Sequence, residues 1–369
     1  MKSPGLPILA ALMILLAGGC MKDDELWDFD RLDVDLPQSG LFILNEGNFT
    51  YGNASLSYYD PESGELLNDV FFQTNALPMG DVAQSISIRD SLAYIVINNS
   101  GRIYVISTST FEYLGKITGL TSPRYIHFVN DEKAYVSDLY AQVISIVDPR
   151  SLEVTGTIPV ANHSSSFKQH STEQMLQYGH YLYVNCWSFD NQILLIDTET
   201  DRVVDSIEVV KQPQSMAMDR YNNLWILSDG GFEGSPYGYE PGALSRVAAG
   251  SRQPEIIHRF QSGEQPSELC INGRGDTLYL LNRNVYRMPV EASPGTVPEL
   301  FSESPYGQNH QGGYYGLQVD PATSEVYVSD AIDYVQRGAV YRFSPSGQCS
   351  DTLRVGISPG AFAFKAVSE

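Results

Sequence analysis

Basic residues are scarce in this chain. Its 369 residues include 23 Lys and Arg against 44 Asp and Glu, which gives a formal net charge of −21 at pH 7. So acidic a chain repels phosphate backbones, and nucleic acid is excluded as an expected partner. Charged residues make up only 18% of the chain and hydrophobic residues 43%. That balance argues against both a disordered protein and a multi-pass membrane protein.

Cysteine and recognisable catalytic motifs are also scarce. Apart from Cys20, the cysteines are Cys186, Cys270 and Cys349, an odd number spaced far apart, so no disulfide framework is indicated. The sequence has no Cys-x-x-Cys, His-Glu-x-x-His, Gly-x-Ser-x-Gly or Walker motif. We therefore expect a protein that is not an enzyme and that carries no metal or resident cofactor.

The N-terminus has the layout of an export signal. Lys2 precedes an apolar stretch over residues 8–16 that is too short to span a bilayer. Residues 16–20, Leu-Ala-Gly-Gly-Cys, resemble a bacterial lipobox, and Met-Lys-Asp-Asp-Glu at 21–25 is similar to the surface-export signal of Bacteroidota lipoproteins. We expect a signal peptide over 1–19 and an acylated Cys20 that begins a flexible acidic tether over 20–39. Acyl chains would then anchor the protein to the outer membrane, exposed at the cell surface.

The remainder of the chain repeats. A unit of about 40 to 54 residues recurs, and each unit contains four short predicted strands. The second strands are predicted at 41–46, 92–98, 133–138, 181–187, 223–228, 277–282 and 325–330. The first strands are predicted at 83–88, 123–128, 173–178, 214–219, 266–271, 315–319 and 359–364.

The order of these strands indicates a closed ring. The unit that begins at Leu41 lacks a first strand of its own, whereas the final first strand stands alone at the C-terminus. Residues 361–365 would complete the blade begun at Leu41 and leave no open edge. The sequence thus predicts an all-β fold over 40–369, a seven-bladed β-propeller of four-stranded antiparallel blades closed by the C-terminal strand.

The longer connections are predicted to share one face. In such blades the loops between strands two and three and the links between blades emerge at the same end. Here they include residues 46–54, 71–81, 159–172, 187–191, 228–242, 302–314 and 329–338. Long loops on a rigid scaffold are where binding sites are usually built.

Aromatic and amide side chains are abundant in these loops and predict a ligand-binding face, because rings give contact area at low entropy cost and amides adapt their hydrogen bonds. The predicted contacts are Asn45, Asn48, Tyr51, Asn98, Asn99, Tyr140, His163, His170, Trp187, Phe189, Phe232, Tyr237, Tyr239, Asn284, Tyr306, Asn309, His310, Tyr314, Tyr315 and Tyr334.

Plainer interpretations stay open for several of these residues. Any single loop tyrosine also fits a packing role, and Asn45 and Asn98 also fit a bulge and a hairpin turn. The loop histidines could ligate a metal, but their spacing matches no standard site. A ring of carboxylates near the ends of second strands fits turn capping better than cation binding, namely Asp138, Asp190, Asp229, Asp330 and Asp333.

Two family resemblances add to this interpretation. Tyr-Val-Ser-Asp at 135–138, Ile-Val-Asp-Pro at 146–149 and Thr-Ile-Pro-Val at 157–160 resemble the units of YVTN-repeat propellers. The opening residues 41–49, Leu-Phe-Ile-Leu-Asn-Glu-Gly-Asn-Phe, with 52–60, Gly-Asn-Ala-Ser-Leu-Ser-Tyr-Tyr-Asp, resemble the BtuG surface lipoproteins of Bacteroidota. That resemblance implies capture of cobalamin or a related corrinoid as a transported ligand, and its handover to a TonB-dependent outer-membrane transporter.

Two other classes of function remain alternatives. The propeller could be a scaffold that binds a protein or a glycan at the cell surface. Less favoured is a metal-dependent lactonase or lyase that uses loop carboxylates, because one fold hosts many activities.

Overall fold

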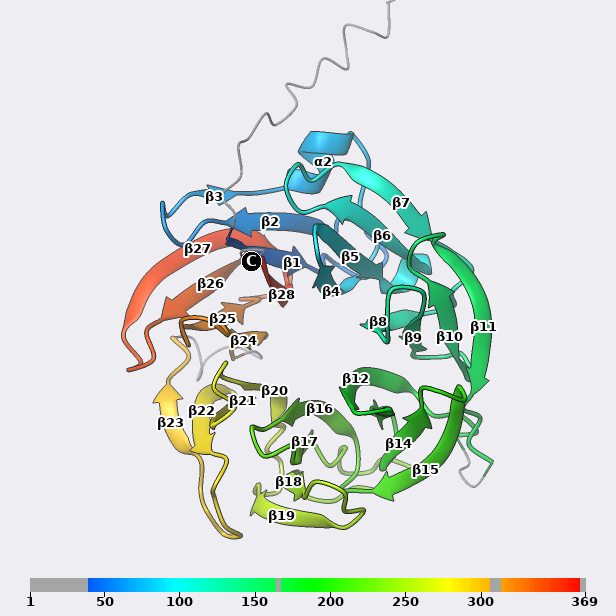
Figure 1. Ribbon diagram of the computed structural model, residues 1–369. Helices are drawn as coiled ribbons and strands as arrows, with labels where there is room; N and C mark the ends of the chain where they lie inside the picture. The colour runs from blue at the N-terminus through cyan, green and yellow to red at the C-terminus, as the bar shows by residue number, and fades with distance from the viewer. Residues whose placement is uncertain (1–38, 164–166, 306–312, 366–369) are drawn as a thin grey trace, which may run out of the picture.

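The computed structural model describes residues 39–163, 167–305 and 313–365, and the account that follows concerns these residues. They form seven four-stranded antiparallel sheets arranged as blades around an axis (Figure 1). The predicted seven-bladed propeller is confirmed. Within these ranges no helix has the length and apolar character needed to cross a membrane.

Each blade runs from an innermost strand to an outermost strand. Blade 1 contains β28 (Pro359–Lys365), β1 (Gly40–Asn45), β2 (Ser55–Tyr59) and β3 (Leu66–Leu67). Blade 2 contains β4 (Ala83–Arg89), β5 (Leu92–Ile97), β6 (Arg102–Ser107) and β7 (Tyr113–Ile117). Blade 3 contains β8 (Pro123–Phe128), β9 (Ala134–Asp138), β10 (Val143–Asp148) and β11 (Glu153–Pro159). Blade 4 contains β12 (Thr172–Tyr178), β13 (Tyr181–Cys186), β14 (Gln192–Asp197) and β15 (Arg202–Glu208).

The other three blades repeat this plan. Blade 5 contains β16 (Pro213–Met218), β17 (Leu224–Ser228), β18 (Ala243–Val247) and β19 (Pro254–Arg259). Blade 6 contains β20 (Ser267–Ile271), β21 (Thr277–Asn282), β22 (Asn284–Pro289) and β23 (Glu299–Ser302). Blade 7 contains β24 (Leu317–Val319), β25 (Val326–Asp330), β26 (Arg337–Phe343) and β27 (Cys349–Ile357).

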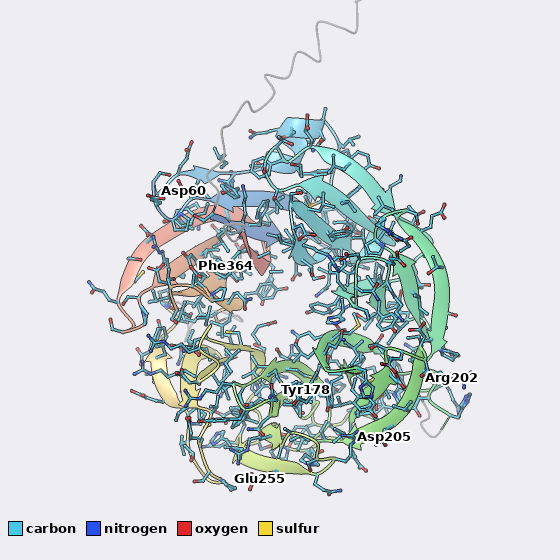
Figure 2. All side chains as sticks on the ribbon, viewed as in Figure 1. Asp60, Tyr178, Arg202, Asp205, Glu255 and Phe364 are labelled. Carbon is cyan, nitrogen blue, oxygen red and sulfur yellow. The ribbon has the colours of Figure 1, made fainter. Side chains whose placement is uncertain are left out.

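The ring closes where the sequence predicts. β28 pairs antiparallel with β1, and Leu41 lies opposite Phe364 and Ile43 opposite Phe362. The core lies between neighbouring blades, as where Leu41 and Ile43 pack against Tyr327 of blade 7. Each inner strand therefore buries side chains on both faces of its sheet, whereas outermost strands such as β11 and β15 are largely exposed. Arg202, Asp205 and Glu255 of those outer strands lie at the rim (Figure 2).

One short helix was not predicted. α2 (Val70–Asn75) lies within a segment expected to be a loop, and it buries Val70 and Phe71. Phe71 packs at 5.2 Å from the ring of Tyr104. Six residues are too few to show a helical period in the sequence. A single 3₁₀ turn, η2 (Asn98–Ser100), follows β5.

Ring closure can be tested by removing the closing strand. Deleting residues 359–369 should lower the unfolding temperature by roughly 10 °C or more, because it exposes one edge of β1 and uncovers the core around Leu41. Adding a synthetic 359–369 peptide should restore part of the loss. Thermal unfolding followed by circular dichroism measures both effects. An unchanged unfolding temperature would contradict closure through β28.

Candidate binding face and central channel

The loops between second and third strands and the links between blades emerge at one end of the propeller, called here the loop-rich face. The longest are the link from Leu67 to Ala83, which contains α2, the loop from Ser228 to Ala243 and the link from Ser302 to Leu317. The opposite end has mostly short turns, although residues 290–298 between β22 and β23 form an insertion there that the sequence analysis did not identify.

Exposed aromatic side chains mark the loop-rich face. Phe49 and Tyr51 of blade 1 are 67% and 78% exposed, and Tyr140 of blade 3 is 62% exposed. Phe232 of blade 5 and Tyr334 of blade 7 are 49% and 42% exposed. All five lie in connections between a second and a third strand, so four separate blades present a ring to solvent.

Other predicted rings pack against one another. Phe189 lies 4.6 Å from the ring of Tyr237 and 5.1 Å from that of Phe167, which joins loops of blades 4 and 5 to the link between blades 3 and 4. Tyr315 meets Tyr334 edge to face at 5.5 Å. These contacts fix the loops, and every ring named here keeps part of its surface exposed.

Hydrogen bonds hold two more of the predicted aromatic side chains in place, those of Trp187 and Tyr239. The Trp187 indole Nε1 donates to Asp229 Oδ2 at 2.9 Å, while burial raises the pKa of Asp229. Tyr239 shares a 2.9 Å hydrogen bond with the hydroxyl of Ser262.

The amide residues divide into structural and available groups. Asn45 is fully buried and donates to Ser57 at 3.1 Å, and Asn98 donates to the backbone of Pro123 at 3.1 Å. Tyr314 is buried as well and donates to the carbonyl of Glu303 at 2.9 Å. These three side chains lie beneath the face, so they hold the fold.

Four other predicted contacts lie nearer the surface. Asn48, Asn99, Asn284 and His163 are exposed or half-buried. Asn48 donates to the backbone of Tyr334, and Asn99 donates to Asp81. Asn284 accepts the backbone N–H of Ser304 at 2.9 Å. Four predicted residues fall outside the described ranges, namely Cys20, Tyr306, Asn309 and His310.

The carboxylates at the ends of second strands cap turns. Asp138 accepts the backbone N–H groups of Tyr140 and Ala141, at 3.0 Å and 2.8 Å. Asp229 and Asp330 each accept the N–H group two residues further on, both at 2.7 Å. Asp190 differs, because it also bonds a histidine.

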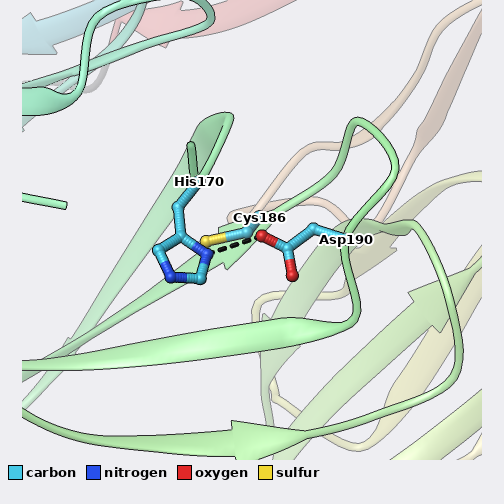
Figure 3. Close-up of side chains that lie close together, drawn as sticks. All are labelled: His170, Cys186 and Asp190. Carbon is cyan, nitrogen blue, oxygen red and sulfur yellow. Dashed lines mark hydrogen bonds and ion pairs between the residues drawn. The ribbon is translucent and has the colours of Figure 1, made fainter. Parts of the chain in front are cut away.

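The side chains of His170 and Asp190 lie next to each other at the loop-rich end of blade 4 (Figure 3). His170 Nδ1 lies 2.6 Å from Asp190 Oδ2, and the two side chains are 15% and 4% exposed. The thiol of Cys186 completes a group whose ligand atoms lie within 4.8 Å of one another. Burial, reinforced by the nearby Asp190 carboxylate, raises the pKa of that thiol. Among the predicted contacts, His170 alone belongs to this group.

A circle of polar side chains, called here the polar ring, was not predicted from the sequence. It is carried by the innermost strands, which surround the axis of the propeller, called here the central channel. The second residue of β4, β8, β12, β16 and β20 is polar, namely Gln84, Arg124, Glu173, Gln214 and Glu268. Gln318 is the second residue of β24 but lies further along the blade, because Leu317 pairs with Val328 as Leu269 pairs with Leu280. That recurrence after a strand's first residue is the signal that could have identified the ring. Arg124 Nε lies 2.7 Å from Glu173 Oε2, and Arg124 also donates to Gln84.

The ring continues in blade 1 through a side chain from another strand end. The second residue of β28 is Gly360, and a Cβ there would lie only 2.1 Å from Glu46 Oε1. The absence of a side chain lets the Glu46 carboxyl lie over β28, where its Oε2 accepts the Tyr315 hydroxyl at 2.8 Å. Three carboxyl groups thus share the channel with the Arg124 guanidinium.

Burial and like charge shift these carboxyl groups. Burial raises the pKa of Glu46 to about 7. Burial, with the neighbouring Glu46 and Glu173 carboxylates, raises the pKa of Glu268 to about 7. Glu46 and Glu268 keep intermediate solvent exposure while protein surrounds them, as expected for the wall of a narrow channel. Glu173 is 3% exposed, and its Oε1 has no hydrogen-bond partner in the described part of the chain.

Two hollows lie at the end of the propeller with the short turns. One of about 650 Å³ is lined by residues of blades 5, 6 and 7, including Arg220, Arg274 and Arg287. Another of about 340 Å³ lies between blades 2 and 3, beside Tyr94 and Pro149. Neither is lined by a predicted contact residue.

These features define the class of the protein as a seven-bladed β-propeller with one loop-rich face and an acidic channel. The chain belongs to the family described as "Domain of unknown function (DUF5074)", whose model matches residues 39–347. No curated protein matches the sequence.

Several solved structures share the fold. The periplasmic gluconolactonase of Pseudomonas aeruginosa has a TM-score of 0.64 at 14% identity, over 89% of this chain and 99% of that one. A putative 6-phosphogluconolactonase from Bacteroides fragilis has a TM-score of 0.61 at 12% identity, over 89% and 98%. A quinonprotein alcohol dehydrogenase-like protein from Bacteroides thetaiotaomicron has a TM-score of 0.61 at 12% identity, over 89% and 78%. At such identities the likeness shows the fold alone.

The raised pKa of Glu268 predicts a pH-dependent stability. Between pH 4.5 and about 7 the folded protein holds a proton at Glu268 that the unfolded chain releases. The stability contributed by that proton is present at low pH and is lost as pH rises through 7. The unfolding temperature of Glu268→Gln relative to that of wild type should therefore rise by roughly a few degrees as the pH is raised from 5 to 8.

Thermal unfolding at several pH values measures this difference. Glu299→Gln is the matched control, because Glu299 is exposed and its pKa is lowered by the Arg287 side chain. The control should keep a constant offset from wild type over the same range. A Glu268→Gln offset that is equally constant would show that Glu268 ionises normally.

Proposed function

We propose that this chain captures cobalamin or a related corrinoid on the loop-rich face. The supporting observation is the set of exposed rings that four blades present on that face, Phe49 and Tyr51 among them. A corrinoid is a broad macrocycle with apolar methyl groups and peripheral amides, so it suits a wide surface of rings better than a narrow basic pocket. The resemblance of the opening strand to the BtuG lipoproteins supports the same ligand.

The polar groups of the face suit an amide-rimmed ligand. Exposed Asn99 lies in blade 2, where no exposed ring is found among the described loop residues, and half-buried Asn284 lies in blade 6. Amide side chains both donate and accept, as corrinoid side chains do. The net charge of −21 disfavours strongly anionic ligands such as nucleotides.

In this proposal the protein is a cell-surface lipoprotein of the outer membrane. The acylated Cys20 anchors it, and residues 20–39 tether the propeller above the membrane. The bound corrinoid is passed to a TonB-dependent transporter. A corrinoid is too large for ordinary outer-membrane pores, and a surface receptor raises its concentration beside the transporter.

A second candidate function is hydrolysis or elimination on a lactone-like substrate. One observation favours it: Glu46 and Glu268 have pKa values of about 7 beside Arg124, and a group that titrates near neutral pH suits acid–base catalysis. We propose binding without catalysis as the principal function. Lactone turnover by the purified protein, abolished by Glu268→Gln, would favour the second candidate instead.

Corrinoid binding can be measured by titrating cyanocobalamin into the purified protein in a calorimeter. The double variant Tyr51→Ala, Tyr140→Ala should bind at least about fivefold more weakly, because each ring contributes about 0.5–1.5 kcal/mol of contact. Both side chains are highly exposed, at 78% and 62%, so the fold should tolerate their loss.

The matched control is Tyr178→Ala. Tyr178 is 44% exposed but lies at the end of β12 that joins the short turn to β13, away from the loop-rich face. The control should bind cyanocobalamin like wild type. Equal affinity in all three proteins would place the ligand elsewhere. Binding of a glycan or a protein, with no affinity for cyanocobalamin, would support the scaffold alternative.

The membrane anchor gives a separate prediction. Cys20→Ser should abolish incorporation of labelled palmitate and release the protein from the membrane fraction, because the thiol is the site of diacylation. Cys349→Ser, which changes an exposed cysteine of β27, is the control and should remain labelled. Labelling that survives in Cys20→Ser would contradict the proposed anchor.

A further inference from the structure

We propose that His170, Cys186 and Asp190 form a binding site for a borderline-soft divalent metal ion, with Zn²⁺ as the best match. The site lies on the loop-rich face, above the interface of blades 3 and 4 (Figure 3). None of its three residues is one of the exposed rings or of the channel carboxyls, and the inference does not rest on corrinoid binding.

The donor set selects the class of metal. One imidazole nitrogen, one thiol sulfur and one carboxylate oxygen lie within 4.8 Å of one another. Calcium and magnesium prefer oxygen ligands alone, whereas zinc accepts nitrogen, sulfur and oxygen together. Three protein ligands leave the fourth position of a tetrahedral zinc ion open. Zinc sites that bind water or another small molecule have this arrangement.

Burial and charge fit a dication. Cys186 is fully buried among the apolar side chains between blades 3 and 4, and the Asp190 side chain is 4% exposed. A thiolate and a carboxylate together carry two negative charges, which a divalent ion neutralises. Buried charge is tolerated where it is balanced in this way. His170 keeps 15% exposure, which leaves a path from solvent.

Metal binding needs a small rearrangement. His170 Nδ1 and Asp190 Oδ2 are now 2.6 Å apart and hydrogen-bonded. A tetrahedral zinc ion with bonds of about 2.0–2.1 Å would hold these two atoms about 3.3 Å apart. The imidazole must therefore move by less than about 1 Å. On metal binding the Cys186 thiol loses its proton to solvent, and His170 binds through Nδ1 with its ring proton on Nε2.

The three ligands come from separate elements. His170 belongs to the link that precedes β12, Cys186 ends β13, and Asp190 lies in the turn between β13 and β14. Phe167 of the same link packs against Phe189 and Tyr237. An ion that joins His170 to blade 4 would therefore fix one aromatic cluster of the loop-rich face.

Zinc binding is tested on purified, chelator-treated protein by competition with a chromophoric zinc indicator. We expect one equivalent of Zn²⁺, with affinity at least tenfold lower in both Cys186→Ser and His170→Ala. Co²⁺ should give a thiolate-to-metal absorption band that Cys186→Ser lacks. Cys270→Ser is the matched control, because Cys270 is a buried thiol of blade 6 outside the group. It should bind like wild type.

Thermal unfolding separates metal binding from damage to the fold. Zn²⁺ should raise the unfolding temperature of wild type and Cys270→Ser but leave that of Cys186→Ser unchanged. If Cys186→Ser folds poorly, Asp190→Asn with Co²⁺ as the probe takes its place, and an altered absorption band supports the site. No stoichiometric Zn²⁺ binding by wild type, or binding equal in wild type and both ligand variants, would overturn the proposal.

Discussion

The antiparallel pairing of β28 with β1 is the interaction on which the rest of the structure depends. It brings together the two ends of the described chain, with Leu41 opposite Phe364, and it pairs the inner edge of β1. Contacts between blades 1 and 7 reinforce the closure. Arg342 of blade 7 donates to the Tyr59 hydroxyl of blade 1 at 3.3 Å, and that hydroxyl donates to Asp351 of blade 7 at 3.1 Å. Only a closed ring gives every blade two neighbours, and only then do seven sets of loops face the same way.

Closure also explains how polar residues are divided between structure and surface. Side chains at the ends of second strands hold the first strand of the next blade, as Asn98 does at Pro123 and Asn185 at Pro213, where the distance is 2.7 Å. The amide groups of these side chains are therefore hydrogen-bonded within the fold. The loops that follow other second strands carry rings such as Tyr140 and Tyr334, which remain exposed. A third polar set lies in the channel. Burial raises the pKa of Glu46, Glu173 and Glu268, and at Glu268 the other two carboxylates add to the rise.

Most of the fold could be predicted from the sequence because its repeat is carried by strongly apolar second strands. β21 has the predicted bounds, and β9 begins one residue later than predicted. α2 could not be predicted, since its six residues show no period. The sequence could not decide whether Asn45 and Asn98 are buried, because asparagine occurs both in structural turns and in ligand-binding sites. The channel ring depends on strand register, and the group of His170, Cys186 and Asp190 depends on how a link folds back on blade 4. The channel ring leaves a recurrence in the sequence once the strand starts are known, whereas no sequence spacing encodes the group of His170, Cys186 and Asp190.

Hydrogen–deuterium exchange of the purified protein, with and without cyanocobalamin, tests the central claim most directly. The account predicts slower exchange in the connections between second and third strands, above all at residues 46–54 and 139–142, with no change at the opposite end. Protection confined to the turns around Arg220 and Arg274, which line the hollow at that opposite end, would contradict the assignment of the loop-rich face as the binding surface.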